Sequence, residues 1–262
     1  MKKEIEFVTG PVNAPSPTAP PKMEAKWQDI TLTPAASRLR VKFAEGKNPI
    51  RLIPALPGGS NSYVEKLDVI KNDAFKAVAQ PGDLFARALS WLWSNKKDAI
   101  YHYEKNKTGI KLKAQSEAVA WCIWWDTENK PRLGLMQSAF STGKSPGLLA
   151  DIVSAAEATE AQPGSDETVR VYDHSVADQL HGRIITIEKT VDKSVEARFG
   201  TSYKATISSK EAGDIMTLIN QLSDEERDLL CPLDKLIRVP TEDEQRALLS
   251  GYLGATFREM GI

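Results

Sequence analysis

Residues 111–126, KLKAQSEAVAWCIWWD, join a basic start to an apolar run that contains three tryptophans. This stretch predicts a β-strand, and alternation along it would put Trp121 and Trp125 on one face and Trp124 on the other. Lysines supply charge for phosphates and tryptophan rings supply faces for bases, so the composition favours single-stranded nucleic acid as a ligand. Tryptophans at period two are also common in hydrophobic cores, and for each ring that interpretation stays open.

The composition is that of an ordinary globular protein. The chain has 262 residues, of which 41% are hydrophobic, enough for one large domain or for a core domain with appendages. It has no apolar run of roughly 18 residues, and its start, MKKEIEFVTG, lacks the apolar stretch of a signal peptide. We therefore expect an intracellular, cytoplasmic protein without a membrane span.

The charges are divided unevenly along the chain, although they nearly cancel to a net charge of -1. Residues 22–144 contain 20 lysines and arginines against 12 aspartates and glutamates, whereas residues 145–262 contain 12 against 21. Such asymmetry indicates a basic binding surface with an acidic appendage. The alternative is a globular protein whose surface charges are segregated without a functional reason.

Three regions follow from the distribution of prolines, strands and helices. Residues 1–34 form an arm and tether, because five prolines within residues 10–22 exclude a helix or a sheet ladder there. Residues 35–208 are rich in strand patterns and form the core, and residues 209–262 form an acidic helical region. The expected fold class is α+β, with helices inserted into and following a β-rich core.

Alternation and capping residues predict the individual elements. Apolar and basic residues alternate through residues 39–43, which predicts a strand with a basic outer face. Asp83, Ser223 and Thr241 are expected to cap helices. Besides the tryptophan strand, strands are expected at residues 39–43, 49–56, 62–70, 132–138, 182–190 and 202–208, and helices at residues 83–94, 144–160, 210–222 and 241–253.

Candidate ligand contacts are the basic and aromatic residues near these strands. Residues 96–113 hold six lysines with Tyr101 and Tyr103 among them, a pattern typical of a strand-binding loop; a solvated charged loop is the alternative. The expected phosphate contacts are Arg38, Arg40, Lys42, Arg51, Lys105, Lys107, Lys111, Lys113 and Arg198. The expected stacking residues are Tyr63, Tyr101, Tyr103, Trp121, Trp125, Phe199 and Tyr203, about half of which we expect in the core instead.

The sequence carries no motif for catalysis or for a cofactor. It lacks a phosphate-binding loop, a nucleophile elbow and an HExxH helix, and its three histidines are scattered. Cys122 and Cys231 lie far apart without the paired spacing of a zinc site, so reduced, buried thiols are expected. We therefore expect no enzymatic activity, no metal and no other cofactor.

Five landmarks between residues 35 and 208 occur in a distinctive order. They are a turn followed by IRLIP, the basic KLKAQSEA leading into an apolar strand, the polar turn DTENKP, a helix headed by Gly143 and Lys144, and a late hairpin from DQLHGRIITIEK to FGTSYKATIS. Their order and spacing resemble those of the phage single-stranded DNA-binding proteins related to the T-even phage helix-destabilising protein. The resemblance implies an OB-fold core whose cleft holds single-stranded DNA, in the cytoplasm of a bacterial host.

The sequence departs from that family at three points. Where the family has a cysteine-rich zinc site, this chain has DLFARALSWLWSNKKDAIYHYEKN, which contains no cysteine and only His102, so an apolar helix is expected there instead of zinc. The family's basic N-terminal arm, used for cooperative binding, is represented only by Lys2 and Lys3. The family's acidic C-terminal tail is weaker here, because the chain ends with the apolar GYLGATFREMGI.

These observations predict a sequence-nonspecific single-stranded DNA-binding protein of phage-type replication, recombination or repair, with a basic groove for the backbone and aromatic rings for the bases. Replication proteins at the C-terminal region and further copies of the chain on DNA are expected partners; a membrane is not. The acidic region is expected to occupy the groove when DNA is absent, and a helix packed permanently on the core is the alternative. The alternative functions are a phage structural or assembly protein and a DNA-processing enzyme such as a nuclease.

Overall fold

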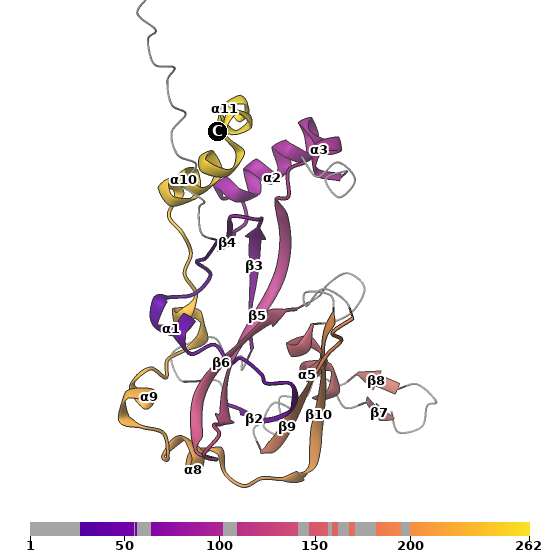
Figure 1. Ribbon diagram of the computed structural model, residues 1–262, viewed down its shortest axis with the longest axis vertical. Coiled ribbons are helices and arrows are strands. Elements are labelled where there is room, and N and C mark those ends of the chain that lie inside the picture. The colour runs from indigo at the N-terminus through magenta and orange to yellow at the C-terminus, as the bar shows by residue number, and fades with distance from the viewer. Residues whose placement is uncertain are drawn as a thin grey trace, which may run out of the picture.

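The tryptophan-rich stretch forms the longest described strand, β5 (Lys113–Trp125), around which an eight-stranded sheet is built (Figure 1). The computed structural model describes residues 27–54, 56, 64–101, 109–140, 147–156, 159–161, 168–170, 182–194 and 200–262. The middle of β5 pairs with both β3 (Glu65–Lys71) and β6 (Pro131–Ala139), and its last part pairs with both β2 (Gly46–Leu52) and β6. Because a strand has two edges, β3 and β2 share one edge of β5 and β6 takes the other.

Two further strands extend the sheet at each end. β4 (Phe75–Val78) pairs with β3, and the short β1 (Gln28–Asp29) pairs with β4. On the other side, β9 (Arg183–Val191) pairs with β2, and β10 (Thr201–Glu211) pairs with β9. β1 and β10 are the two ends of this order, so the sheet does not close into a barrel. The predicted α+β class is therefore confirmed, whereas an OB-fold is not. A separate two-stranded ribbon is formed by β7 (Thr159–Ala161) and β8 (Thr168–Arg170).

The predicted strand at residues 39–43 is wrong. The chain forms helix α1 (Pro34–Arg38) just before it, and the residues that follow have no regular strand structure. Thr33 caps this helix through its side-chain oxygen, and Pro34 suits the first helical position. Local capping therefore stabilises a helix directly before the residues predicted as a strand. Arg40 makes an isolated parallel bridge to β6, which holds this segment along the edge of the sheet.

The helix starts predicted from capping residues are confirmed. Asp83 accepts a hydrogen bond of 2.8 Å from the third backbone amide of its helix, at the start of α2 (Leu84–Asn95). Ser223 and Thr241 each form a reciprocal capping box with a glutamate three residues later, at the starts of α9 (Asp224–Asp228) and α10 (Glu242–Leu253). Capping is a contact within one helical turn, which is why the sequence alone predicts it correctly.

Other helices are shorter than predicted. The helix expected at residues 210–222 is reduced to α8 (Ile215–Ile219), because β10 continues to Glu211. The helix expected at residues 144–160 is described as α5 (Leu148–Ala156). No helix within the described residues combines the length and the apolar character needed to cross a membrane. The remaining helices are α3 (Lys97–Tyr101), the 3-10 helix η1 (Leu233–Leu236) and α11 (Ala255–Met260).

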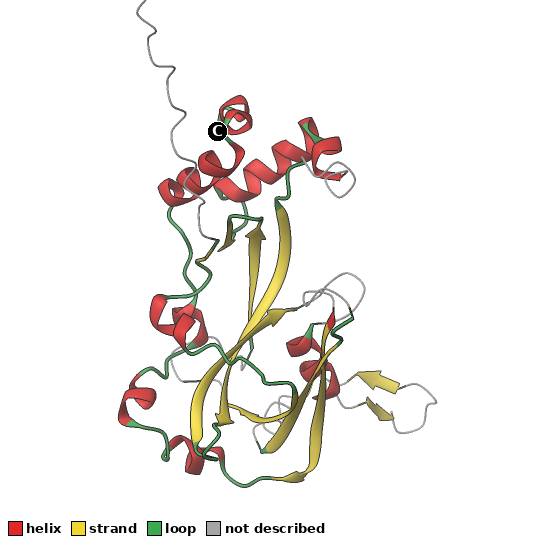
Figure 2. Ribbon diagram, viewed as in Figure 1, coloured by secondary structure: helices red, strands yellow, loops and turns green. Residues whose placement is uncertain are grey.

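Three hydrophobic clusters hold the helices on the sheet. Figure 2 shows these helices in red beside the yellow strands. In the first, α8 and η1 cover the face of β5 that carries Trp121. In the second, α10 and α11 pack with α2 at one end of the molecule. In the third, α5 packs against β2, β9 and the opposite face of β5. The region from residue 209 onward thus contributes to two clusters and is part of the packed fold, which agrees with the alternative of a permanently packed helix.

Candidate functional site

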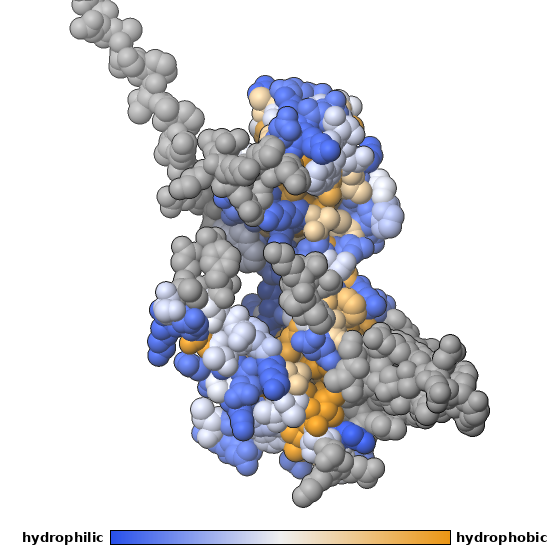
Figure 3. All heavy atoms as spheres, turned by 90° about the vertical axis from the view of Figure 1, so that its right-hand side faces the viewer, coloured by the Kyte–Doolittle hydropathy of each residue, from blue (hydrophilic) through white to orange (hydrophobic). Residues whose placement is uncertain are grey.

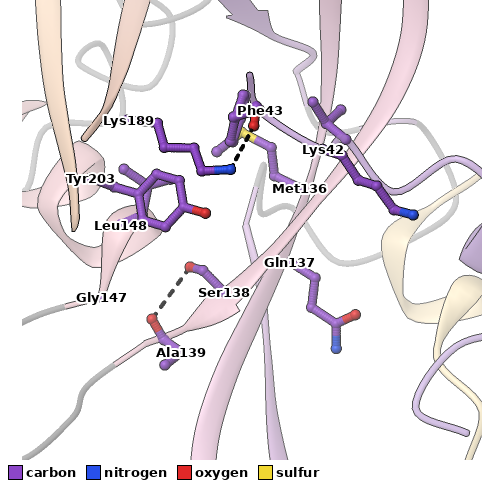
Figure 4. Close-up of a pocket in the computed structure, with 11 residues that line it drawn as sticks. Lys42, Phe43, Met136, Gln137, Ser138, Ala139, Gly147, Leu148, Lys189 and Tyr203 are labelled. Carbon is purple, nitrogen blue, oxygen red and sulfur yellow. Dashed lines mark hydrogen bonds between the residues drawn. The ribbon is translucent and has the colours of Figure 1, made fainter. Parts of the chain in front are cut away.

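Two of the predicted contact residues, Lys42 and Tyr203, lie on one surface groove of about 600 Å³ (Figure 4). The groove lies between the segment before β2, the end of β6, the start of α5 and the β9–β10 hairpin. Its lining consists of Val41, Lys42, Phe43, Met136, Gln137, Ser138, Ala139, Gly147, Leu148, Lys189 and Tyr203. The groove therefore combines cationic and aromatic side chains from segments more than 100 positions apart in the sequence.

The sheet register explains why Tyr203 is exposed. Tyr203 of β10 lies opposite Lys189 of β9, so the two side chains share one face of the sheet. Further along the same face of β10, Ala205 and Ile207 pack against the core cluster beneath α5. Tyr203 lies where this face leaves the core, and its side chain is 43% exposed. An aromatic ring exposed beside a cation is available to a ligand.

Phe43 supports the Tyr203 ring from the other wall of the groove. The two ring centroids are 6.3 Å apart and the planes meet at 63°, an edge-on arrangement. The Lys189 ammonium donates a hydrogen bond of 3.0 Å to the Phe43 carbonyl, as the dashed line in Figure 4 shows. A lysine ammonium has three N–H donors. This contact uses one of them to fix the position of the Lys189 charge and leaves the others for a ligand. Lys42 is exposed at the same groove.

Close backbone packing closes one end of the groove. The Gly147 amide donates a hydrogen bond of 2.9 Å to the Phe140 carbonyl, which brings the start of α5 against the end of β6. A Cβ at position 147 would overlap the Ala139 carbonyl, so only glycine permits this approach. Met136 and Leu148 supply apolar surface to the groove. The groove thus has an apolar floor beside the Lys189 ammonium, whereas the Lys42 side chain points away from Lys189 and Tyr203 (Figure 4).

Arg51 and Trp121 were predicted as ligand contacts, and both predictions are wrong because the residues are buried, each with 2% exposure. The Arg51 guanidinium donates to the carbonyls of Ala212 and Gly213, at 3.1 and 2.7 Å, and so ties β2 to the chain that follows β10. The Trp121 indole donates a hydrogen bond of 2.8 Å to the Cys231 carbonyl, within the cluster covered by α8 and η1. Both side chains are structural.

Arg40 also has a structural role in place of the predicted phosphate contact. Its guanidinium lies 2.8 Å from the Asp29 carboxylate, which is also 2.9 Å from the Lys76 ammonium. Lys76 in turn pairs with the buried Glu117 at 3.0 Å. Burial alone would raise the pKa of Asp29, but hydrogen bonds from Arg40, Thr31 and Lys76 outweigh it and hold the pKa at about 2. This network joins β1, β4 and β5.

The remaining predicted residues are dispersed. Lys111 forms an ion pair of 2.6 Å with Asp73, and Lys113 is exposed at the start of β5. Arg38 is exposed at the end of α1, and Trp125 is half-buried at the end of β5. Tyr63, Tyr103, Lys105, Lys107, Arg198, Phe199 and the side chain of Tyr101 lie outside the described residues.

Sequence reasoning missed Phe43 and Lys189 as members of the groove. Phe43 was assigned to the inner face of a strand that does not form, and Lys189 carried no signal beyond its place in a predicted strand. The pairing of Lys189 with Tyr203 depends on the hairpin register, which alternation alone does not give.

The described part of the chain contains neither a metal-binding cluster nor a reactive thiol. No group of three or more histidine, cysteine, aspartate or glutamate side chains within those residues could hold a metal ion. Burial raises the pKa of Cys122 far above the usual range of a thiol, and that of Cys231 is raised by burial as well. Neither described thiol is therefore activated as a nucleophile.

No protein-family model matches the chain, and no curated protein matches it either. The function is therefore inferred from the geometry of the groove that Lys42, Phe43, Lys189 and Tyr203 line. What such a groove can do is bind a flexible anion that has a flat, apolar part. It offers ammonium groups for the charge and an exposed ring with an apolar floor for the flat group.

Proposed function

We propose that this protein binds single-stranded DNA without sequence specificity, in the groove that Tyr203, Phe43 and Lys189 line. The observation that carries the proposal is the Tyr203 ring, exposed within a groove and placed directly opposite Lys189 on the neighbouring strand. Single strands bind where cations track the phosphates and aromatic rings stack the bases. Duplex DNA buries its base faces in the helix, so it offers this groove no face on which Tyr203 could stack.

Each groove residue has a distinct part in this binding. Tyr203 stacks a base, and the edge of Phe43 keeps the Tyr203 ring in position. Lys189, held by the Phe43 carbonyl, presents its remaining N–H donors to a phosphate. Lys42, whose side chain points outward from the groove, contacts a phosphate further along the strand. Stacking and phosphate pairing do not distinguish the four bases, so little sequence preference is expected.

The order of landmarks through residues 35–208 supports a place among the phage single-stranded DNA-binding proteins, with a role in replication, recombination or repair. Within this proposal, the strands β2, β5, β6, β9 and β10 with helix α5 correspond to an open, OB-type arrangement. The groove on the β9–β10 side corresponds to the cleft that such a core offers a strand. Contacts with replication proteins and with further copies of the chain belong to the same proposal.

Binding to a labelled oligo-dT is expected to be at least about tenfold tighter than binding to a duplex of the same length, and to weaken steeply with salt. The reason is that a flexible strand presents phosphates and base faces to one groove at once. Fluorescence anisotropy with both ligands at two salt concentrations measures this. Equal affinity for the duplex, or binding independent of salt, would contradict the proposal.

Removing the exposed ring is expected to weaken binding of oligo-dT by about tenfold in Tyr203→Ala, whereas Tyr203→Phe retains most of the affinity because it keeps the stacking face.

Lys42→Glu is expected to weaken binding and to lower the log–log salt slope by about 0.7, the value for one phosphate contact on a single strand. Lys235→Glu is the charge-matched control, since Lys235 is exposed on η1 and does not line the groove. Equal effects of the two lysine variants would place the strand elsewhere.

A further inference from the structure

The segment that follows α1 starts alongside β6 and then separates from it. The Leu135 amide donates a hydrogen bond of 2.8 Å to the Leu39 carbonyl, and the Val41 amide donates one of 3.0 Å to the Leu135 carbonyl. These two bonds form the parallel bridge between Arg40 and Leu135. Beyond it, no backbone hydrogen bond joins the described residues of this segment to β6. The two segments therefore pair at a single position.

The groove occupies the space where the two segments part. Val41 and Phe43 line one side of it, and residues 136–139 of β6 line another. The Phe43 carbonyl accepts its hydrogen bond of 3.0 Å from the Lys189 ammonium, so the segment has turned from β6 toward β9 at this point. The outer edge of β6 is consequently left open along the groove.

Gln137 directs its backbone groups to this open edge. Residues along an antiparallel strand point their N–H and C=O groups alternately to its two edges. The backbone groups of Leu135 point away from β5, since they bond to residues 39 and 41, and those of Gln137, two residues later, point the same way. None of the hydrogen bonds among the described residues uses the Gln137 amide N–H or carbonyl.

The side chain of Gln137 is occupied on the other face of the sheet. Its Nε2 donates to the Glu117 carboxylate at 2.8 Å and to the Thr31 hydroxyl at 3.0 Å. Figure 4 shows this side chain turned away from Tyr203 and Lys189. Gln137 therefore offers a ligand in the groove its backbone, with one hydrogen-bond donor next to one acceptor.

Apolar surface alone does not mark a binding site on this molecule. Figure 3 shows hydrophobic surface in a vertical band down the side that faces right in Figure 1, with hydrophilic surface beside it. Among the large hydrophobic residues exposed in the described part of the chain, Tyr203 is the one that lines the groove. The groove combines this exposed ring with the open donor and acceptor of Gln137. A ring-shaped ligand with its own donor and acceptor at one edge, such as a nucleobase, matches that combination.

We propose that the Gln137 N–H and C=O bind the pairing edge of the base that stacks on Tyr203, the edge that is hydrogen-bonded to a partner base in a duplex. This rests on the proposed function of the groove and specifies what the groove selects, an unpaired base. Each of the four bases carries a donor next to an acceptor on that edge, so the contact requires no particular sequence. A base within a duplex offers the groove neither its face nor this edge.

The test changes the ligand and leaves the protein intact. Oligo-dT of about 16 nucleotides is compared with the same strand made of N3-methylthymidine, which keeps the phosphates and the ring face but loses the N3–H donor. The methylated strand is expected to bind about tenfold more weakly, because the Gln137 groups are left without partners, and to keep the salt slope of oligo-dT. Oligo-dU is the matched control. It lacks only the C5 methyl group, which lies outside the pairing edge, and is expected to bind as tightly as oligo-dT.

Amide hydrogen exchange followed by NMR locates the contact on the protein. With saturating oligo-dT, the Gln137 amide is expected to exchange at least about tenfold more slowly than in the free protein, and with saturating methylated strand it is expected to exchange as in the free protein. The Leu135 amide is the matched control. It already donates to the Leu39 carbonyl, so its exchange should be the same with and without DNA.

The outcomes separate this inference from the function on which it rests. If the wild-type protein binds neither strand, the proposed function fails and the edge contact fails with it. Equal binding of the two strands overturns the edge contact and leaves the groove as a stacking site. A weaker methylated strand without slower exchange at Gln137 also overturns it, since the pairing edge is then bound elsewhere.

Two further exchange results would contradict the edge contact. Equal protection of the Gln137 amide by both strands would mean that DNA only shields it from water. Protection that is present without DNA and grows with protein concentration would mean that a second copy of the chain pairs with the open edge of β6.

Discussion

Trp121→Ala is expected to lower the free energy of unfolding by about 3–5 kcal/mol, the range for truncating a fully buried large aromatic side chain. The indole is 2% exposed and lies between β5 and the helices α8 and η1. Its N–H donates to the Cys231 carbonyl at 2.8 Å, so the variant also removes a hydrogen bond that ties the C-terminal region to the sheet. Urea denaturation followed by circular dichroism measures the loss.

Two further variants serve as comparisons for Trp121→Ala. Trp121→Phe keeps an aromatic ring but removes the donor to Cys231, so it is expected to cost less than the alanine variant. Trp93→Ala truncates a half-exposed tryptophan and is expected to cost about 1 kcal/mol or less. If the Trp121 and Trp93 variants lose similar stability, the C-terminal helices do not pack on β5 as described.

The same packing changes the expectation for the C-terminal region. An acidic appendage that leaves the groove on DNA binding would have to detach from the sheet. The segment from residue 211 onward instead contributes Ile215, Ile219 and Leu222 to the cluster around Trp121, and Leu249 and Phe257 to the cluster around α2. Deleting it would expose both clusters, so an unfolded or insoluble product is expected in place of tighter DNA binding.

Local features of the fold could be predicted from the sequence because their causes lie within a few residues. The caps at Asp83, Ser223 and Thr241 are contacts within one helical turn, and each marks a helix start in the structure. The tryptophan strand was predicted for a similar reason, since thirteen residues of strand pattern outweigh any local alternative. The prediction at residues 39–43 was wrong for a non-local reason: after α1 the chain makes an isolated bridge from Arg40 to Leu135 of β6 and not a ladder, and alternation does not reveal how far such pairing extends.

Whether a side chain is buried or exposed was harder to predict, because this depends on partners distant in the sequence. Arg51 and Trp121 lie on strands covered on both faces, where alternation no longer separates buried from exposed positions. Their partners, the carbonyls after β10 and at Cys231, are more than 100 positions away. The groove residues are likewise distant in the sequence. Only the order of the strands in the sheet brings Lys189 and Tyr203 next to Phe43.

Replacing Asp29 with asparagine is expected to reduce the free energy of unfolding at neutral pH by about 2 kcal/mol. The Asp29 carboxylate contacts Arg40 at 2.8 Å and Lys76 at 2.9 Å, and its pKa is lowered from the ordinary 3.8 to about 2. Folding thus favours the charged form. Its contribution is fully present above the ordinary pKa and is lost as the pH falls toward about 2. The variant should therefore be less stable than the wild type at pH 7 and approach it in acid.

The control for this pH dependence is Asp228→Asn, because Asp228 is exposed on α9 away from the network. Urea denaturation of the three proteins between neutral pH and about pH 2 should show a flatter stability profile for Asp29→Asn and an unchanged profile for Asp228→Asn. Lys76 keeps its pairing with Glu117 at 3.0 Å in the Asp29 variant, so the loss should stay below that of an unpaired buried charge. If the Asp29 variant follows the wild-type profile throughout, the contacts of β1 with Arg40 and Lys76 do not hold the edge of the sheet.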